Sequence, residues 1–301
     1  MDWLLLLIIA YFFISLTALT DKFLLNNILG EPVVYAFLVS ALGLVAVLLA
    51  PFGLIWPGYW QLLISLIAGF SFTFALFFLY KSLKIGETSR VFTTVGSLGA
   101  VLTFTFSAIF LKEILNSSEI FGFVFLIIGG ILISLDFQAK RKFNKSYLIF
   151  SLLAALMFAI SYTSAKHIYT VQGFISGFVW LRIFAFIAGL LFLVSRKNFQ
   201  LVKKELQKGS LISKKSNQFI LIGGQASSAV GFLILNYVIS LKNPAIVLAG
   251  QGLQYAFLFI FTLAISNFFP KILKEEITAL IILQKGLAIV LISIGLVVVA
   301  F

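Results

Sequence analysis

The 301-residue sequence contains no cysteine, one histidine and ten acidic residues. Without cysteine the chain cannot form a disulfide or a thiolate metal site, and one imidazole cannot build a histidine metal cluster. Charged residues make up 11% of the chain and hydrophobic residues 61%, with a mean hydropathy of +1.14. An enzyme needs a nucleophile, base or metal constellation, which this composition hardly supplies. We therefore expect no enzymatic activity and no cofactor.

Long apolar stretches dominate the sequence. A helix needs about 20 mostly apolar residues to cross a bilayer. The runs here are apolar at nearly every position over about twice the length of a β-barrel strand, which favours helices. We predict an all-α polytopic membrane protein whose ten spans lie at 3–20, 33–55, 60–80, 88–110, 119–136, 147–165, 174–195, 219–240, 245–266 and 278–300.

The ten spans fall into two similar sets of five, at 1–138 and 146–301. Because five is odd, the second set must enter the bilayer in the opposite orientation to the first. Two inverted repeats around a shared midplane are typical of secondary transporters, because two near-equivalent halves let one site open to either side. The sequence thus predicts ten transmembrane helices in two inverted five-helix repeats.

The same short segments recur in both sets. Tyr80–Lys84 ends the third span, and Tyr237–Lys242 ends the eighth. After the following span, Leu111–Leu115 in the first set corresponds to Leu273–Thr278 in the second. Glycines follow both segments, as expected for helices that pack closely. These anchors recur in the same order and support an internal duplication.

Together with Phe110–Glu113, the glycine-bearing fifth span and the segment Trp180–Ala185, these pieces resemble the ten-span EamA type of the drug/metabolite transporter superfamily. The resemblance covers almost the whole chain. It implies a cavity between the halves, lined mainly by spans 1, 3, 4, 6, 8 and 9, with spans 5 and 10 at the periphery. It also implies alternating-access transport of amino acids, metabolites or drugs, which we expect to be export. The alternative is a lipid or lipid-linked-sugar flippase of the same fold.

The distribution of Lys and Arg predicts the orientation. Loops after the odd-numbered spans hold most of them, whereas the opposite side holds only Lys112, Lys166 and Lys242. By the positive-inside rule, the basic side is cytoplasmic and both termini face outward across the inner membrane. The same rule accounts for the net charge of +12 without a nucleic-acid partner.

Polar side chains within apolar spans are candidates for substrate contact, because they cost free energy in hydrocarbon unless they find partners or line a wet cavity. Ser and Thr could instead bond to their own helix, and Tyr could belong to an interfacial belt. The predicted substrate-binding residues are Thr93, Ser97, Tyr162, Gln225, Asn236, Gln251, Gln254 and Tyr255.

Arg182 is the one charge that the sequence places well inside a span. It could hold a carboxylate or phosphate with its two-pronged guanidinium, or it could bond helix-end carbonyls or extend to the interface. We favour the structural role, because span 7 lies outside the helices expected to line the cavity. No carboxylate is predicted in the middle of a span. The sequence therefore does not decide whether transport is coupled to a proton; if it is, Asp21 or Glu87 would bind that proton. The expected partners are a small-molecule substrate and membrane lipids, and we expect a monomer.

Overall fold

The computed structural model describes residues 2–27, 31–86, 88–134, 145–207, 215–268 and 279–300. All regular structure in these residues is helical. The first half contains the α-helices α1 to α5, with a 3-10 helix η1 after α2 and a short π-helix η2 after α4. Their bounds are α1 Asp2–Asn27, α2 Pro32–Gly43, η1 Leu44–Phe52, α3 Tyr59–Ile85, α4 Thr88–Phe106, η2 Ser107–Leu111 and α5 Ser117–Ser134.

The second half continues with seven helices, of which α8 and α10 are short. Their bounds are α6 Lys145–Gln172, α7 Phe174–Phe192, α8 Arg196–Gln207, α9 Lys215–Leu241, α10 Pro244–Ala249, α11 Gly252–Phe268 and α12 Ala279–Ala300. Within the described residues, nine helical segments are long and apolar enough to cross a membrane, and α5 supplies a shorter apolar helix. This set of helices fits an integral, polytopic membrane protein, as the sequence predicts.

Among the differences between the predicted spans and the structure, two concern the sixth and the ninth span. The sixth was expected to end at residue 165, but α6 continues to Gln172 and so contains Lys166, which the sequence assigned to a loop. Span nine was expected as one helix over 245–266, but it is interrupted at Gly250 and Gln251 between α10 and α11. The first difference arises because a charge usually ends a span. The second arises because uniform apolarity indicates that a segment lies in the membrane, not where its backbone hydrogen bonds change.

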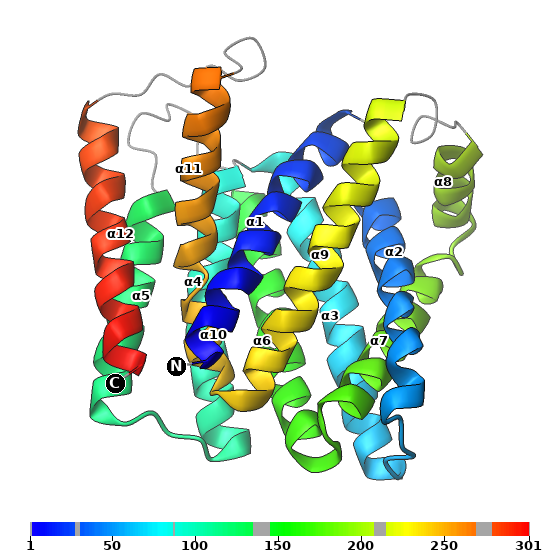
Figure 1. The fold of residues 1–301 in the computed structure, drawn as a ribbon. Helices are drawn as coiled ribbons and strands as arrows, with labels where there is room; N and C mark the ends of the chain where they lie inside the picture. Colours follow the sequence, from blue (N-terminus) through cyan, green and yellow to red (C-terminus); the bar gives the residue numbers. More distant parts are fainter. Residues whose placement is uncertain are drawn as a thin grey trace.

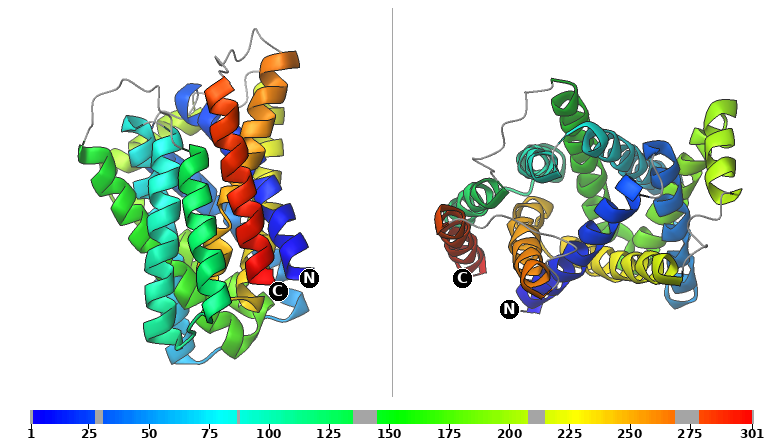
Figure 2. Two further views of the ribbon diagram at one scale, coloured as in Figure 1. Left: turned by 90° about the vertical axis from the view of Figure 1, so that its left-hand side faces the viewer. Right: turned by 90° about the horizontal axis from the view of Figure 1, so that it is seen from above.

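The helices form one bundle in which α1 and α6 run in opposite directions (Figure 1, Figure 2). The two chain ends lie at the same end of the bundle, and α5 and α12 stand together at one edge (Figure 1). The other extensive contacts join α3 with α6, α1 with α9, α4 with α6, and α3 with α7. Within the described residues, α2 and α9 make no comparable contact. The bundle is therefore closely packed between α3 and α7 but not between α2 and α9.

Glycines allow the closest of these approaches. A Cβ atom at Gly69 of α3 would lie 2.6 Å from the Leu181 carbonyl oxygen of α7, and one at Gly122 of α5 would lie 2.8 Å from the Gly295 carbonyl oxygen of α12. Both separations are too short for a real carbon–oxygen contact, so a larger residue would push the helices apart. The glycine-bearing fifth span thus packs against α12, as small residues do between membrane helices.

Candidate functional site

A cavity of about 100 Å³ lies between the two halves of the sequence. Its walls come from α1, α2, α3, α4, α6, α9 and the α10–α11 segment, and no described residue of α5, α7 or α12 lines it. Aliphatic and phenylalanine side chains cover most of its surface. The polar side chains in its lining are Tyr11, Thr17, Tyr80, Tyr162, Gln225, Ser228, Gln251 and Gln254. A mostly apolar cavity with a few polar groups is the usual form of a small-molecule site.

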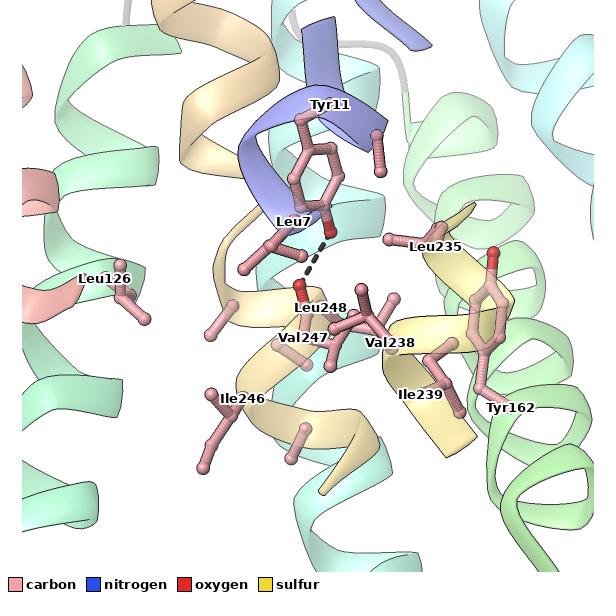
Figure 3. Close-up of a cluster of buried hydrophobic side chains, with 14 of the residues drawn as sticks. Leu7, Tyr11, Leu126, Tyr162, Leu235, Val238, Ile239, Ile246, Val247 and Leu248 are labelled. Carbon is pink, nitrogen blue, oxygen red and sulfur yellow. Dashed lines mark hydrogen bonds between the residues drawn. The ribbon is translucent and has the colours of Figure 1, made fainter. Parts of the chain in front are cut away.

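An apolar cluster lies next to Tyr11, with Leu7 one turn nearer to the start of α1 (Figure 3). Leu7 of α1, Val238 and Ile239 of α9, and Ile246 of α10 are all completely or almost completely buried there. Above them, the Tyr11 hydroxyl donates a hydrogen bond to the Val247 carbonyl oxygen at 2.7 Å (Figure 3). Tyr11 also lines the cavity, so closely packed side chains border the cavity there.

The break between α10 and α11 explains why the Val247 carbonyl is free to accept this bond. In a continuous α-helix it would accept from the Gln251 N–H. Here the Gln251 N–H instead bonds to the Leu248 carbonyl oxygen at 3.0 Å, and the Gln254 N–H bonds to the Gln251 carbonyl oxygen at 2.9 Å. These tighter bonds leave an acceptor that Tyr11 satisfies. Irregular backbone at membrane depth is tolerated where protein or a cavity surrounds it.

Glycines of α4 face this break. A Cβ atom at Gly96 would lie 2.5 Å from the Gln251 side-chain oxygen, so only glycine fits there with Gln251 in its present position. One turn further on, Gly99 lines the cavity, and a Cβ atom there would meet nothing within 4 Å. Sequence reasoning missed both residues because glycine carries no polar group. Their spacing of three, on one helix face opposite a polar span, was the available signal.

Four of the predicted substrate-binding residues line the cavity: Tyr162 of α6, Gln225 of α9, and Gln251 and Gln254 beside the helix break. Tyr162 stacks on Phe158 with ring centroids 5.7 Å apart. The Gln251 side-chain amide lies 3.4 Å from the Gln254 side-chain oxygen, which it reaches as a long hydrogen bond. All four belong to the second half of the sequence, and the first half adds the polar side chains of Tyr11, Thr17 and Tyr80 to the same cavity.

Three others border a separate void of about 20 Å³ on the far side of Gly96, namely Thr93, Ser97 and Tyr255. The Ser97 hydroxyl donates to the Thr93 carbonyl oxygen of its own helix at 2.7 Å. The Tyr255 hydroxyl donates to the Phe92 carbonyl oxygen at 2.6 Å and so ties α11 to α4. Ser97 thus makes the bond to its own helix that the sequence left open as an alternative.

Asn236 lines neither the cavity nor the void. Its side-chain oxygen accepts a hydrogen bond from the Tyr169 hydroxyl at 2.8 Å, and its amide donates to the Phe232 carbonyl oxygen at 2.8 Å. The residue is 3% exposed. The first bond links α9 to α6, and the second lies within α9. In this conformation Asn236 therefore holds helices together instead of facing the space where a ligand would lie.

A second pocket, of about 300 Å³, opens beside the first between α2, η1, α7 and α9. Both pockets share Val39, Gln225, Ser228 and Phe232, so they adjoin each other. This lateral pocket lies where α2 and α9 make no extensive contact. Its remaining lining is aliphatic or aromatic, apart from Arg182 of α7.

Arg182 is 6% exposed, and its guanidinium carbon lies 4.7 Å from the ring centroid of Phe72 and 4.9 Å from that of Phe178. Within the described residues it makes neither a hydrogen bond to a helix-end carbonyl nor an ion pair. Arg182 therefore neither bonds a helix-end carbonyl of the described part nor extends to the interface, which are the two structural roles that the sequence suggested. Cation–π attraction offsets part of the cost of its burial.

Arg182 is also not the one charge inside a span. Lys166 of α6 is 7% exposed, donates to the Ser240 carbonyl oxygen at 3.1 Å and lies 3.7 Å from a carboxylate oxygen of Glu113. Lys285 of α12 lies over the Phe259 ring at 4.3 Å. Glu87 and the side chain of Asp21, the candidates for proton coupling, fall outside the described residues.

No protein-family model matches this sequence, and no curated protein matches it. Among solved structures, one described only as "Crystal structure of protein" superposes with a TM-score of 0.65 at 14% sequence identity. The alignment covers 99% of this chain and 96% of that one. At this identity the likeness concerns the fold alone, over essentially the whole length of both chains.

Proposed function

We propose that this protein is a secondary transporter of small organic solutes, such as amino acids, metabolites or drugs, and that it works as an exporter. The observation that carries the proposal is the cavity between the two sequence halves, which takes polar side chains from both and borders a broken helix. Transporters commonly place their substrate at a repeat interface beside discontinuous helices. Rocking of the halves would close one entrance and open the other.

The helix contacts support the part of the proposal that assigns two inverted repeats. The α3–α6 contact joins the third helix of the first half to the first helix of the second, and the α1–α9 contact is its counterpart with the halves exchanged. The α5–α12 contact joins the last helix of each half. We extend the proposal to membership of the EamA type, a monomer, and a cytoplasmic membrane location with both termini outside.

A lipid or lipid-linked-sugar flippase is the second candidate, and the lateral pocket favours it. Leu42, Val45 and Leu48 line this pocket and are also exposed on the outer surface of α2 and η1. In a membrane, that surface would face hydrocarbon. A substrate with an acyl chain could therefore enter between α2 and α9 without crossing an aqueous entrance.

The test is binding followed by flux. The purified full-length protein would be heated in detergent with amino acids, nucleotides, sugar phosphates, cationic drugs and lipids, because a ligand that binds only the folded state raises its stability. Compounds that stabilise it would then be tested for movement across proteoliposome membranes. Stabilisation and flux with a water-soluble class are expected. Stabilisation and transbilayer movement with lipids alone would favour the flippase instead, and flux of neither would overturn the proposal.

The variant Gly99→Phe tests directly whether the substrate uses the cavity. A side chain at Gly99 projects into open space in the cavity, so phenylalanine is expected to occupy the cavity while α4 keeps its fold. Gly286→Phe on α12 is the matched control, because that glycine is exposed and also has open space around it. We expect Gly99→Phe to lower flux at least about tenfold and Gly286→Phe to leave it unchanged. Equal flux in both variants would show that the substrate does not pass through this cavity.

A further inference from the structure

The lateral pocket combines one buried cation with two polar side chains that have no hydrogen-bond partner among the described residues. Within the described residues Arg182 makes no hydrogen bond and no ion pair, and a third ring, that of Phe232, has its centroid 5.9 Å from the guanidinium carbon. A guanidinium carries five N–H donors in a fixed plane, and an aromatic face accepts none of the in-plane bonds well. Buried donors without acceptors are costly. An acceptor from outside the chain would remove this cost.

Gln225 and Ser228 border the same pocket and lie one helical turn apart on α9. Ser228 is 8% exposed, and the structure gives neither side chain a hydrogen-bond partner among the described residues. Both can donate, as Arg182 does. Among the described residues, no Asp or Glu lines either pocket. Three unused donors that include a permanent positive charge match an anion, and the guanidinium fork fits the two oxygens of a carboxylate or phosphate.

The rest of the lateral pocket defines the other part of the ligand. Val39, Leu42, Val45, Leu48 and Leu49 form an aliphatic wall along α2 and η1. A small inorganic anion would leave this wall uncovered, whereas an apolar group would bury it favourably. The pocket volume of about 300 Å³ is at the lower end of the range for small-molecule sites.

We propose that Arg182, with Gln225 and Ser228, binds the carboxylate or phosphate of an amphiphilic anion whose apolar part lies against α2 and η1. This inference rests on the proposed transport function and names its substrate class. The anion comes either from a water-soluble organic acid or from a lipid headgroup, since both offer the same chemistry to Arg182. The shared lining at Gln225 and Ser228 lets the bound molecule pass from the lateral pocket to the central cavity.

The experiment measures binding to the full-length protein in detergent with probes that share one apolar body. Phenylbutyrate and phenylbutyl phosphate carry the anion, whereas phenylbutanol and phenylbutylamine are the neutral and cationic counterparts. The anions are expected to bind at least about tenfold more tightly than the alcohol or the amine. Arg182→Met is expected to weaken anion binding about tenfold to a hundredfold, as for a lost charge-assisted hydrogen bond, and to leave alcohol binding unchanged.

Equal binding of anion and alcohol, or unchanged anion binding by Arg182→Met, would overturn the inference. If Arg182→Met does not fold, the double variant Gln225→Ala with Ser228→Ala keeps the arginine and is expected to weaken anion binding by a smaller factor. No loss in that variant would count against the site. Ser227→Ala, a neighbouring serine that lines neither pocket, is the matched control and is expected to bind as the unchanged protein does.

A competition experiment identifies the source of the anion. Nanodiscs with phosphatidic acid are compared with nanodiscs of phosphatidylcholine alone. Loss of phenylbutyrate binding in the first indicates a lipid headgroup at Arg182, and retained binding indicates a water-soluble acid; both support an anion site. Proteoliposome flux separates this inference from the transport proposal. Anion binding without flux would overturn transport alone, and flux of a neutral solute that survives Arg182→Met would overturn the anion site alone.

Discussion

Lys166 and Arg182 are two buried positive charges in one bundle, and their surroundings differ completely. The Lys166 ammonium has a carbonyl oxygen at 3.1 Å and a carboxylate oxygen at 3.7 Å. Arg182 has three aromatic rings and an adjoining pocket, and no acceptor within the described residues. Burial alone therefore does not distinguish a structural charge from a binding charge. The presence or absence of an acceptor within the protein does.

The two residues also sit in different parts of the bundle. Lys166 joins α6 to Glu113, which follows η2, and to Ser240 near the end of α9. Its neighbours Ala165 and Ile168 on α6 belong to the apolar cluster. Arg182 lies where α2 and α9 are not closely packed. We interpret the first region as the closed end of the bundle and the second as the part that receives a ligand.

The largest expected difference is in stability. Lys166→Met would leave the Ser240 carbonyl and the Glu113 carboxylate without their partner, and we expect it to lower the free energy of unfolding by about 2 to 3 kcal/mol. Arg182→Met removes a cation without an acceptor and places a thioether among three rings, where it packs well. We expect that variant to lose less than about 1 kcal/mol. Thermal unfolding of both variants in one detergent, without ligand, makes the comparison.

An equal loss in the two variants would contradict this account, because Arg182 would then contribute to the fold as much as Lys166 does. Lys285→Met on α12 is a useful control. Its ammonium lies over the Phe259 ring, away from both pockets.

A smaller effect is expected for the ion pair itself. The Glu113 side chain is about a third exposed and its oxygen is 3.7 Å from the Lys166 nitrogen. Solvent screens such a pair, so a double-mutant cycle with Glu113→Gln and Lys166→Met should give a coupling energy of about 0.5 to 1 kcal/mol. The unfolding free energies of the two single variants and the double variant measure it. A coupling of several kcal/mol would show that the carboxylate, and not the Ser240 carbonyl, is the main partner of Lys166.

The sequence predicted the helical class and nearly all of the apolar segments, because a bilayer requires long apolar runs wherever a helix crosses it. It could not locate the break at Gly250 and Gln251, since the surrounding residues stay apolar and only the hydrogen-bond pattern changes. It also placed Lys166 in a loop, because a charge usually ends a span. The acceptors of Lys166, which are Ser240 and Glu113, lie 74 and 53 positions away in the sequence, so no local pattern indicates them.

The site shows the same limit. Four of the eight predicted substrate-binding residues line the central cavity, since polar side chains in a span must face protein or water. Asn236 is also a polar side chain within a span, but its hydrogen-bond partner is Tyr169 and not a ligand or water. That pairing depends on how α6 and α9 pack against each other. The sequence therefore predicts which spans carry polar groups, whereas tertiary packing decides which groups are left for a ligand. The segments 135–144, 208–214 and 269–278 carry part of the Lys and Arg on which the predicted orientation depends, and they lie outside the described residues.

The most direct test of the proposed transport cavity uses the absence of cysteine, which makes any introduced thiol the only one in the chain. Ser228→Cys lies in the shared lining of both pockets, and Gly286→Cys lies on the outer surface of α12. In sealed membranes, a water-soluble, membrane-impermeant maleimide should label the first variant from the side opposite the termini and should not label the second. An amphiphilic anion such as phenylbutyrate should slow that labelling. If Ser228→Cys stays unlabelled from both sides, or is labelled no faster than Gly286→Cys, no aqueous pathway reaches the cavity and the account is contradicted.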